Sequence, residues 1–267
     1  MNLSEKKKYQ YAFFDSGLGG LPYYIQLKAS APEVSCVYLA DSRHFPYGNK
    51  TREEVISYAS EAADIIIGQF SPEAVIIACN TISVAALDVL RKRFSIPFIG
   101  TVPAIKRAAE ISENRKIGLM ATERTINDPY TEELIRNHAS GYEIVKMGET
   151  DLIFRIETGL ITASAEEKYA AVLPAVKKIL DEGTDTIVLA CTHFLHVHEE
   201  IEKAAGPGVS VVDSRDGVIQ QALRIVPPKP GTQTESMFYH TGTISGQIEA
   251  YYRECAGRAG LAWGGSI

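Results

Sequence analysis

Two stretches of the sequence share one pattern, in which an apolar run of strand length ends in a cysteine and short polar residues. Residues 75–81 read VIIACNT and residues 187–193 read IVLACTH, so Cys79 and Cys191 occupy matched positions. A short apolar run that passes directly into a helix-like stretch predicts a buried parallel strand. The repetition indicates two similar α/β units, each with a thiol at the carboxyl end of a strand.

The rest of the chain supports this fold class. Strand-length runs such as YAFFDS, SCVYLADS, KIGLMAT, YEIVKMG and VSVVDS alternate with segments that can form helices. Such alternation predicts mainly parallel sheets covered by helices on both faces. Ligands of open parallel sheets bind at the carboxyl ends of the strands. Two Rossmann-like α/β domains can therefore place Cys79 and Cys191 on either side of an interdomain cleft.

Composition narrows the possible functions. The chain has 267 residues, of which 45% are hydrophobic and 22% charged, as expected for a globular protein with a substantial core. Its net charge of −6 includes no basic stripe, so we expect no nucleic-acid partner. The N-terminal stretch MNLSEKKKYQYAFF lacks a signal-type apolar core, and no run is long enough to span a membrane. We therefore expect a cytoplasmic protein with a small-molecule ligand and no membrane association.

The four cysteines lack the spacing of a structural zinc site and are too few for a disulfide scaffold. We interpret Cys36 and Cys255 as packing residues, because neither has polar neighbours at a strand end. Cys79 and Cys191 instead precede predicted helices, and a helix N-terminus favours a thiolate.

Short hydrogen-bonding residues surround the predicted strand ends. Ser16, Asn80, Thr81 and Thr192 can contact a ligand there, and helix N-termini bind carboxylates through backbone N–H groups. The adjoining segment DSGLGG lacks the spacing of a dinucleotide-binding or phosphate-binding loop. We therefore expect no nucleotide cofactor.

Further candidates follow other strands. Asp15 ends the first predicted strand, where it can receive a ligand ammonium group, hydrogen-bond a thiol or simply cap the strand. Asp213 and Ser214 end a later strand in the same way. Tyr47 and Gly48 lie in the loop FPYGNKT, which is either part of the site or an ordinary proline turn.

Three histidines after Cys191 raise the alternative of a metal site. His193 and His196 are three positions apart, so a helix beginning near residue 192 places them on one face and His198 elsewhere. The apolar spacing of that helix predicts His196 and His198 on its solvated side. We therefore expect no metal.

Two opposed thiols suit one reaction class better than others. Hydrolysis by a Cys–His pair needs a single thiol, and a redox disulfide needs thiols that touch. Inversion at a carbon acid needs two bases on opposite faces of the carbon. One is a thiolate that removes the proton, and the other is a thiol that delivers one.

The ordered motifs FDSGLGG, LADSRHFPYGNKT, VIIACNTISVAALDVLR, IPFIG, DTIVLACTHF and VVDS resemble those of cofactor-independent glutamate racemases, in the aspartate/glutamate racemase superfamily. The resemblance implies that Cys79 and Cys191 exchange the proton, with Asp15 assisting the first and His193 the second. It also implies a set of substrate-binding residues, with Glu157 as a further match: Asp15, Ser16, Tyr47, Gly48, Asn80, Thr81, Thr122, Thr125, Thr192 and His193.

The resemblance has further implications. It predicts a first domain of residues 1–101 and 213–267, a second domain of residues 102–212, and pseudo-twofold symmetry between them. It also predicts interconversion of L- and D-glutamate for peptidoglycan synthesis, no cofactor and a homodimer. The alternatives are a racemase of another amino acid, such as aspartate, and a weakly catalytic amino-acid-binding relative.

The chain departs from the family pattern at a few positions. Arg124 replaces a glycine in the paired-threonine segment, Leu195 replaces a proline after the CTH motif, and no Cys-Pro precedes the segment of Glu157. We expect these changes to affect the shape and substrate preference of the pocket.

Overall fold

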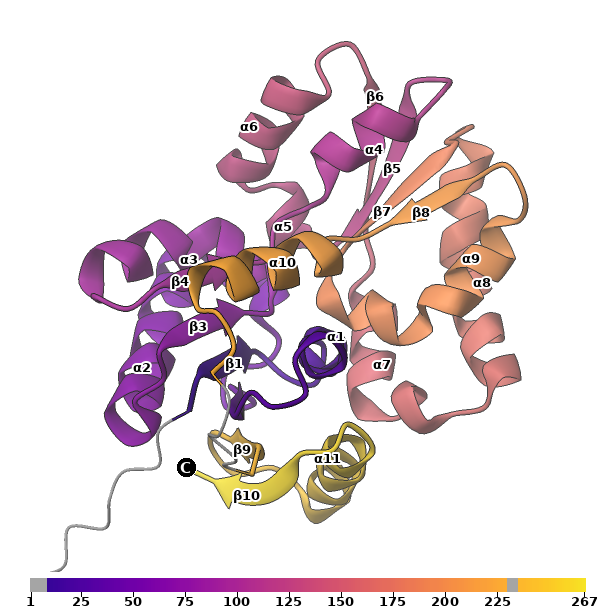
Figure 1. Cartoon of the computed structure of the whole chain (residues 1–267). Helices are drawn as coiled ribbons and strands as arrows, with labels where there is room; N and C mark the ends of the chain where they lie inside the picture. Colours follow the sequence, from indigo (N-terminus) through magenta and orange to yellow (C-terminus); the bar gives the residue numbers. More distant parts are fainter. Residues whose placement is uncertain (1–8, 230–234) are drawn as a thin grey trace, which may run out of the picture.

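The computed structural model describes residues 9–229 and 235–267, and this part of the chain contains two sheets (Figure 1). Every strand pair is parallel, and the predicted α/β class is confirmed. The first sheet has the order β10-β9-β2-β1-β3-β4. Its strands are β1 (Tyr11–Asp15), β2 (Cys36–Ala40), β3 (Ala74–Ile77), β4 (Phe98–Gly100), β9 (Met237–His240) and β10 (Ala262–Ser266).

The second sheet has four strands in the order β6-β5-β7-β8. Its strands all come from the middle of the chain, between the segments that build the first sheet. The predicted domain boundaries follow a similar division and stay a prediction; residues 1–8 and 230–234 of the first predicted domain lie outside the described residues. The strands are β5 (Lys116–Ala121), β6 (Glu143–Gly148), β7 (Thr186–Ala190) and β8 (Ser210–Val212).

Helices connect the strands and cover both sheets. None of the helices within residues 9–229 and 235–267 has the length and apolar character to cross a membrane. Short 3₁₀ helices are denoted η. The helices are α1 (Leu21–Ser30), η1 (Tyr47–Asn49), α2 (Arg52–Phe70), α3 (Asn80–Arg93), α4 (Ile105–Ile111), α5 (Glu123–Ile126), α6 (Pro129–His138), α7 (Thr150–Thr158), η2 (Leu160–Thr162), α8 (Ala165–Asp181), η3 (Thr192–Val197), α9 (His198–Ala205), α10 (Arg215–Ile225) and α11 (Gly246–Arg258).

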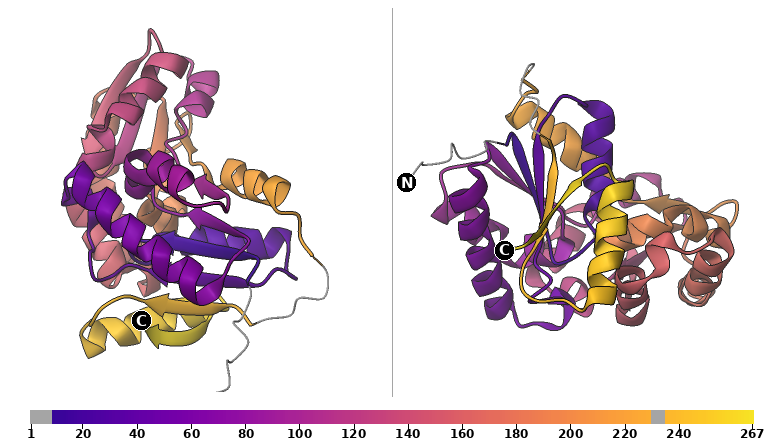
Figure 2. Two further views of the ribbon diagram at one scale, coloured as in Figure 1. Left: turned by 90° about the vertical axis from the view of Figure 1, so that its left-hand side faces the viewer. Right: turned by 90° about the horizontal axis from the view of Figure 1, so that it is seen from below.

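The central strand β1 is apolar up to its last residue because both of its faces are covered. Tyr11 and Phe13 point into one hydrophobic core, and Ala12 and Phe14 point into another. The first core also contains residues of α1 and α11, whereas the second contains residues of α2 and α3. Figure 2 shows α2 and α11 on opposite sides of this sheet. Because both faces are covered, successive side chains of the strand are all buried.

The core that contains Tyr11 and Phe13 continues into the second half of the chain. It includes Leu189 on β7, Phe194 on η3 and Ile156 on α7. Apolar packing therefore joins the two sheets. This contact holds the carboxyl ends of their strands near one another.

Helix α3, which follows Cys79, provides a test of this packing. Leu90 is fully buried, whereas the adjacent Val89 is 37% exposed. Leu90→Ala should lower the free energy of unfolding by about 2–5 kcal/mol, because the cavity left by the side chain stays partly empty. Val89→Ala, the matched control, should change it by less than about 1 kcal/mol. Urea denaturation checks both values, and equal effects would contradict the packing described.

Candidate active site

A pocket lies where the carboxyl ends of the two sheets meet. Its cavity volume is about 50 Å³, so the pocket is small and its walls lie close together. Residues that directly follow strands of both sheets form its walls. The lining residues are Ser16, Phe45, Pro46, Tyr47, Gly48, Asn49, Cys79, Asn80, Thr81, Thr122, Thr150, Ile153, Phe154, Cys191, Thr192 and His193.

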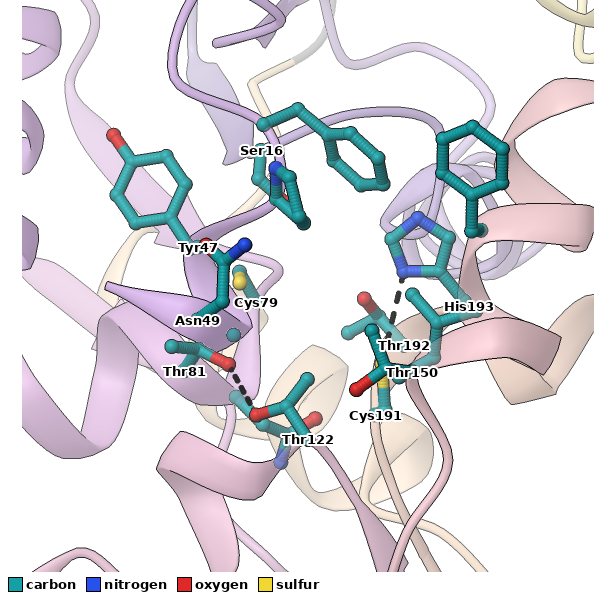
Figure 3. A pocket seen from close by; sticks show the side chains of 16 residues that line it. Ser16, Tyr47, Asn49, Cys79, Thr81, Thr122, Thr150, Cys191, Thr192 and His193 are labelled. Carbon is teal, nitrogen blue, oxygen red and sulfur yellow. Dashed lines mark hydrogen bonds between the residues drawn. The ribbon is translucent and has the colours of Figure 1, made fainter.

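Cys79 and Cys191 lie on opposite walls of this pocket (Figure 3). Cys79 immediately precedes α3, and Cys191 immediately precedes η3. Each is 6% exposed. The two thiols are therefore sheltered from bulk water and accessible only from the pocket between them.

The environment of Cys79 favours the protonated thiol. Burial and then the negative charge of Asp15 raise the pKa of Cys79 well above its ordinary value. The backbone N–H groups of Ile82 and Thr81 act in the opposite direction and do not outweigh them. Cys79 is thus a proton donor at neutral pH.

Cys191 has a different neighbour, the imidazole of His193. The Sγ atom of Cys191 lies 3.7 Å from His193 Nδ1, and His193 Nε2 lies 2.7 Å from Glu157 Oε2. Burial lowers the pKa of His193, but its contacts with Cys191 and Glu157 outweigh burial and raise that pKa well above the ordinary value. A cationic His193 stabilises a thiolate at Cys191.

Glu157 is buried and accepts hydrogen bonds from both halves of the chain. The backbone N–H of Leu18 lies 3.2 and 3.0 Å from its two oxygens, and the Tyr252 hydroxyl contacts Oε1. Together with His193 these groups surround the carboxylate with donors. A carboxylate in such surroundings is an acceptor only, so His193 must present Nε2–H to Glu157, and the cationic ring presents Nδ1–H to Cys191.

Asp15 stands behind the pocket wall and is not among the lining residues. Its Oδ2 accepts a 3.0 Å hydrogen bond from Thr192 Oγ1, and its Oδ1 accepts a 2.9 Å hydrogen bond from the Gly17 N–H. The side chain of Asp15 therefore binds a threonine and the loop after β1 rather than a thiol. Burial, opposed by His193, raises its pKa to about 6.

Three threonines connect the pocket walls from the two sheets. Thr81 Oγ1 lies 2.9 Å from Thr122 Oγ1 and 3.2 Å from Thr125 Oγ1. Beside them, neither side-chain amide atom of the buried Asn80 has a hydrogen-bond partner in the described part of the chain. Because buried polar groups are nearly always paired, this amide has the capacity to bind a polar ligand group.

The loop after β2 forms another part of the wall. The Tyr47 hydroxyl contacts the buried Asp41, so this tyrosine is fixed by its own half of the chain. Gly48 lies so close to the other half that an added Cβ would be 2.8 Å from Thr122 Cβ. Only glycine permits this approach without a shift.

Most of the predicted residues converge on the pocket, but Asp213 and Ser214 do not. Asp213 pairs with Arg215, and Ser214 hydrogen-bonds to Tyr23. Two of the family departures, Arg124 and Leu195, also lie outside the pocket lining.

The prediction that His196 is solvated is wrong. The segment after Cys191 forms a 3₁₀ helix rather than an α-helix, which turns His196 inward so that its Nε2 lies 3.0 Å from the Leu18 carbonyl oxygen. Burial lowers the pKa of His196 to about 3, so it is a neutral donor. His198, also predicted on the solvated side, is half-buried near Asp213. No group of three or more metal-ligating residues occurs within the described ranges.

Sequence reasoning missed the apolar part of the pocket. Phe45 lies with its ring centroid 5.9 Å from that of His193, and Ile153 and Phe154 of α7 complete the lining. Phe45 stands next to the predicted FPYG loop and could have been found from it. Nothing local in the sequence distinguishes Ile153 or Phe154 from ordinary helix residues.

The sequence of the chain matches a known protein family. The Asp/Glu/Hydantoin racemase family matches residues 24–222, which include both cysteines. The chain belongs to this family.

Members with similar sequences are named glutamate racemases. The glutamate racemase of Treponema pallidum is 40% identical over 262 residues, which cover 98% of both chains. The glutamate racemase of Pectobacterium carotovorum is 36% identical over 80% of this chain and 75% of its own.

A solved structure of a family member is also similar along its whole length. The Escherichia coli glutamate racemase, in complex with L-glutamate and the activator UDP-MurNAc-ala, has a TM-score of 0.85 and 26% identity, with 98% of each chain covered. A glutamate racemase isoform from Bacillus anthracis has a TM-score of 0.76 and 25% identity, with 96% of each chain covered.

The buried Asp15 makes folding stability depend on pH. Its pKa rises from 3.8 to about 6 on folding, so the folded protein binds the proton more tightly. This contribution to stability is fully present below pH 3.8 and is lost as the pH rises through 6. Between pH 7 and pH 4, wild type should gain up to about 3 kcal/mol relative to Asp15→Asn. Urea denaturation at each pH measures the difference, and a constant value would contradict the assignment.

Proposed function

We propose that the chain is a glutamate racemase that interconverts L- and D-glutamate by proton transfer between Cys79 and Cys191. The observation that carries the proposal is the position of the two thiols on opposite walls of one pocket. A substrate held between them can lose its α-proton to one thiolate, and the planar carbanion that results can gain a proton from the other thiol on the opposite face. The sequences named glutamate racemase support glutamate as the substrate.

The environments of the two thiols differ. Cys191 lies beside the cationic His193, and Cys79 has its pKa raised by burial and by Asp15. We therefore propose that Cys79 holds its proton at rest and that His193 assists proton exchange at Cys191. In one direction, Cys191 takes the α-proton while Cys79 delivers its own to the other face. The roles are reversed when the product reacts back.

Substrate binding depends on neutral groups. The described pocket lining contains no lysine or arginine, but Ser16, Thr81, Thr192 and the Asn80 amide are present. The N-terminus of α3 adds backbone N–H groups, which bind carboxylates without a positively charged side chain. We propose that these groups bind the carboxylates and ammonium of glutamate, with Tyr47, Gly48, Thr122 and Thr125 completing the pocket.

The biological setting follows from this activity. We propose a cytoplasmic enzyme, active as a homodimer and without an added cofactor, that supplies D-glutamate for peptidoglycan synthesis. Under this proposal, residues 1–101 and 213–267 form one domain and residues 102–212 the other.

The direct test is incubation of the purified protein with L-glutamate in heavy water, without an added cofactor. Circular dichroism should fall to zero as the racemic mixture forms, and NMR should show deuterium at the α-carbon of the product. L-Aspartate serves as the matched alternative substrate. If aspartate is racemised faster than glutamate, aspartate is the substrate. If glutamate binds without α-proton exchange, the chain is a binding protein.

Single cysteine variants test the two-thiol assignment. Cys79→Ala and Cys191→Ala should each lower kcat for racemisation by at least about 10³-fold, since each removes one acid–base group. Cys36→Ala and Cys255→Ala are matched controls, because both residues are buried outside the pocket. Racemisation at the wild-type rate in either pocket variant would exclude the mechanism.

A further inference from the structure

Tyr252 approaches the Cys191 side of the pocket from the C-terminal part of the chain. It lies on α11, whereas the family match ends at residue 222. Its side chain is 2% exposed, and its hydroxyl contacts Glu157 Oε1. Helix α11 belongs to the segment that adds β9 and β10 to the first sheet, while Glu157 lies on α7, which follows β6 of the second sheet along the chain. The contact therefore joins the two halves of the molecule.

The hydroxyl of Tyr252 can act only as a donor in this contact. Burial and the negative charge of Glu157 raise the pKa of Tyr252 well above its ordinary value, so the phenol stays neutral. A carboxylate accepts hydrogen bonds and has none to donate. Tyr252 therefore donates to Glu157 and holds its carboxylate in place, and through it the orientation of the His193 ring.

Two ring contacts fix the position of the donor. The Tyr252 ring meets Phe238 edge to face at a centroid distance of 6.1 Å and an interplanar angle of 89°. It meets His240 at 6.4 Å and 84°. Both partners lie on β9, so the strand that extends the first sheet also orients the phenol. A side chain held on two sides has little freedom to lose when it forms its hydrogen bond.

The resulting chain of contacts runs from Tyr252 through Glu157 and His193 to Cys191. It ends at one thiol only. The charged group that acts on Cys79 is Asp15, which is held by Thr192 and Gly17. Asp15 also interacts electrostatically with His193 and Glu157, whereas the chain of contacts from Tyr252 leads to Cys191.

We propose that Tyr252 is a positioning residue for the Cys191 face of the reaction, which it serves by fixing Glu157 and, through it, the protonated edge of His193. The proposal rests on the racemase function proposed above. It assigns to the C-terminal segment a role in proton transfer at one of the two thiols.

The test compares Tyr252→Phe with Tyr251→Phe. Tyr251 is a matched control on the same helix: its hydroxyl bonds to the Ile156 carbonyl and the Ile161 N–H, both at 2.9 Å, and so contacts the same region through backbone groups alone. Tyr252→Phe should lower kcat roughly 10- to 100-fold with KM changed by less than about threefold, as expected for a lost hydrogen bond to a buried charge. Tyr251→Phe should keep kcat within about threefold of wild type.

Kinetic isotope effects separate positioning from general damage. With α-deuterated glutamate, the isotope effect on kcat/KM reports how far proton removal limits the rate. Slowing only the Cys191 step should raise this effect for the enantiomer that Cys191 deprotonates and lower it for the other. Tyr252→Phe should therefore make the two isotope effects unequal relative to wild type, and Tyr251→Phe should leave their ratio unchanged.

A double-mutant cycle provides the second variant. Glu157→Gln should shift the two isotope effects in the same sense as Tyr252→Phe, and the double variant should lose much less than the product of the single losses. Three outcomes would overturn the proposal. They are losses of kcat that multiply in the double variant, isotope effects that rise equally for both enantiomers, and a Tyr252→Phe variant that behaves like Tyr251→Phe. Absence of racemisation by the wild-type protein would instead refute the proposed function.

Discussion

The site depends on buried hydrogen bonds that join the strand ends of the two sheets. Thr192 donates to Asp15, Thr81 contacts Thr122, and the Leu18 N–H donates to Glu157. A buried polar group left without a partner costs about 1–3 kcal/mol, so these contacts strongly favour one relative placement of the halves. The width of the pocket follows from that placement.

The two thiols occupy matched positions but unlike electrostatic surroundings. Cys79 stands at the start of an α-helix near a carboxyl group, and Cys191 stands at the start of a 3₁₀ helix beside an imidazole. The repeated strand–cysteine pattern therefore supplies equivalent geometry, while neighbouring side chains supply different electrostatic surroundings. A reaction that needs one acid and one base at any moment can use that difference directly.

The sequence predicted those features that depend on local pattern. Apolar runs identified the strands, and the rule that ligands bind at carboxyl ends brought Cys79 and Cys191 into one pocket. The role of Glu157 could be suggested only by resemblance, because its partner His193 is 36 positions away. Tyr252, 95 positions from Glu157, gave no signal at all. His196 was misplaced because the spacing rule for an α-helix does not hold in a 3₁₀ helix.

The route of the C-terminal segment has a consequence for synthesis of the protein. Both cysteines and all lining residues of the pocket lie before residue 194, so they leave the ribosome early. The tyrosine that donates to Glu157 leaves the ribosome only near the end of translation, because it belongs to α11. The buried carboxylate and imidazole thus lack one of their fixed neighbours until the final strands have joined the first sheet. Completion of the hydrogen-bond network is thereby tied to completion of the chain.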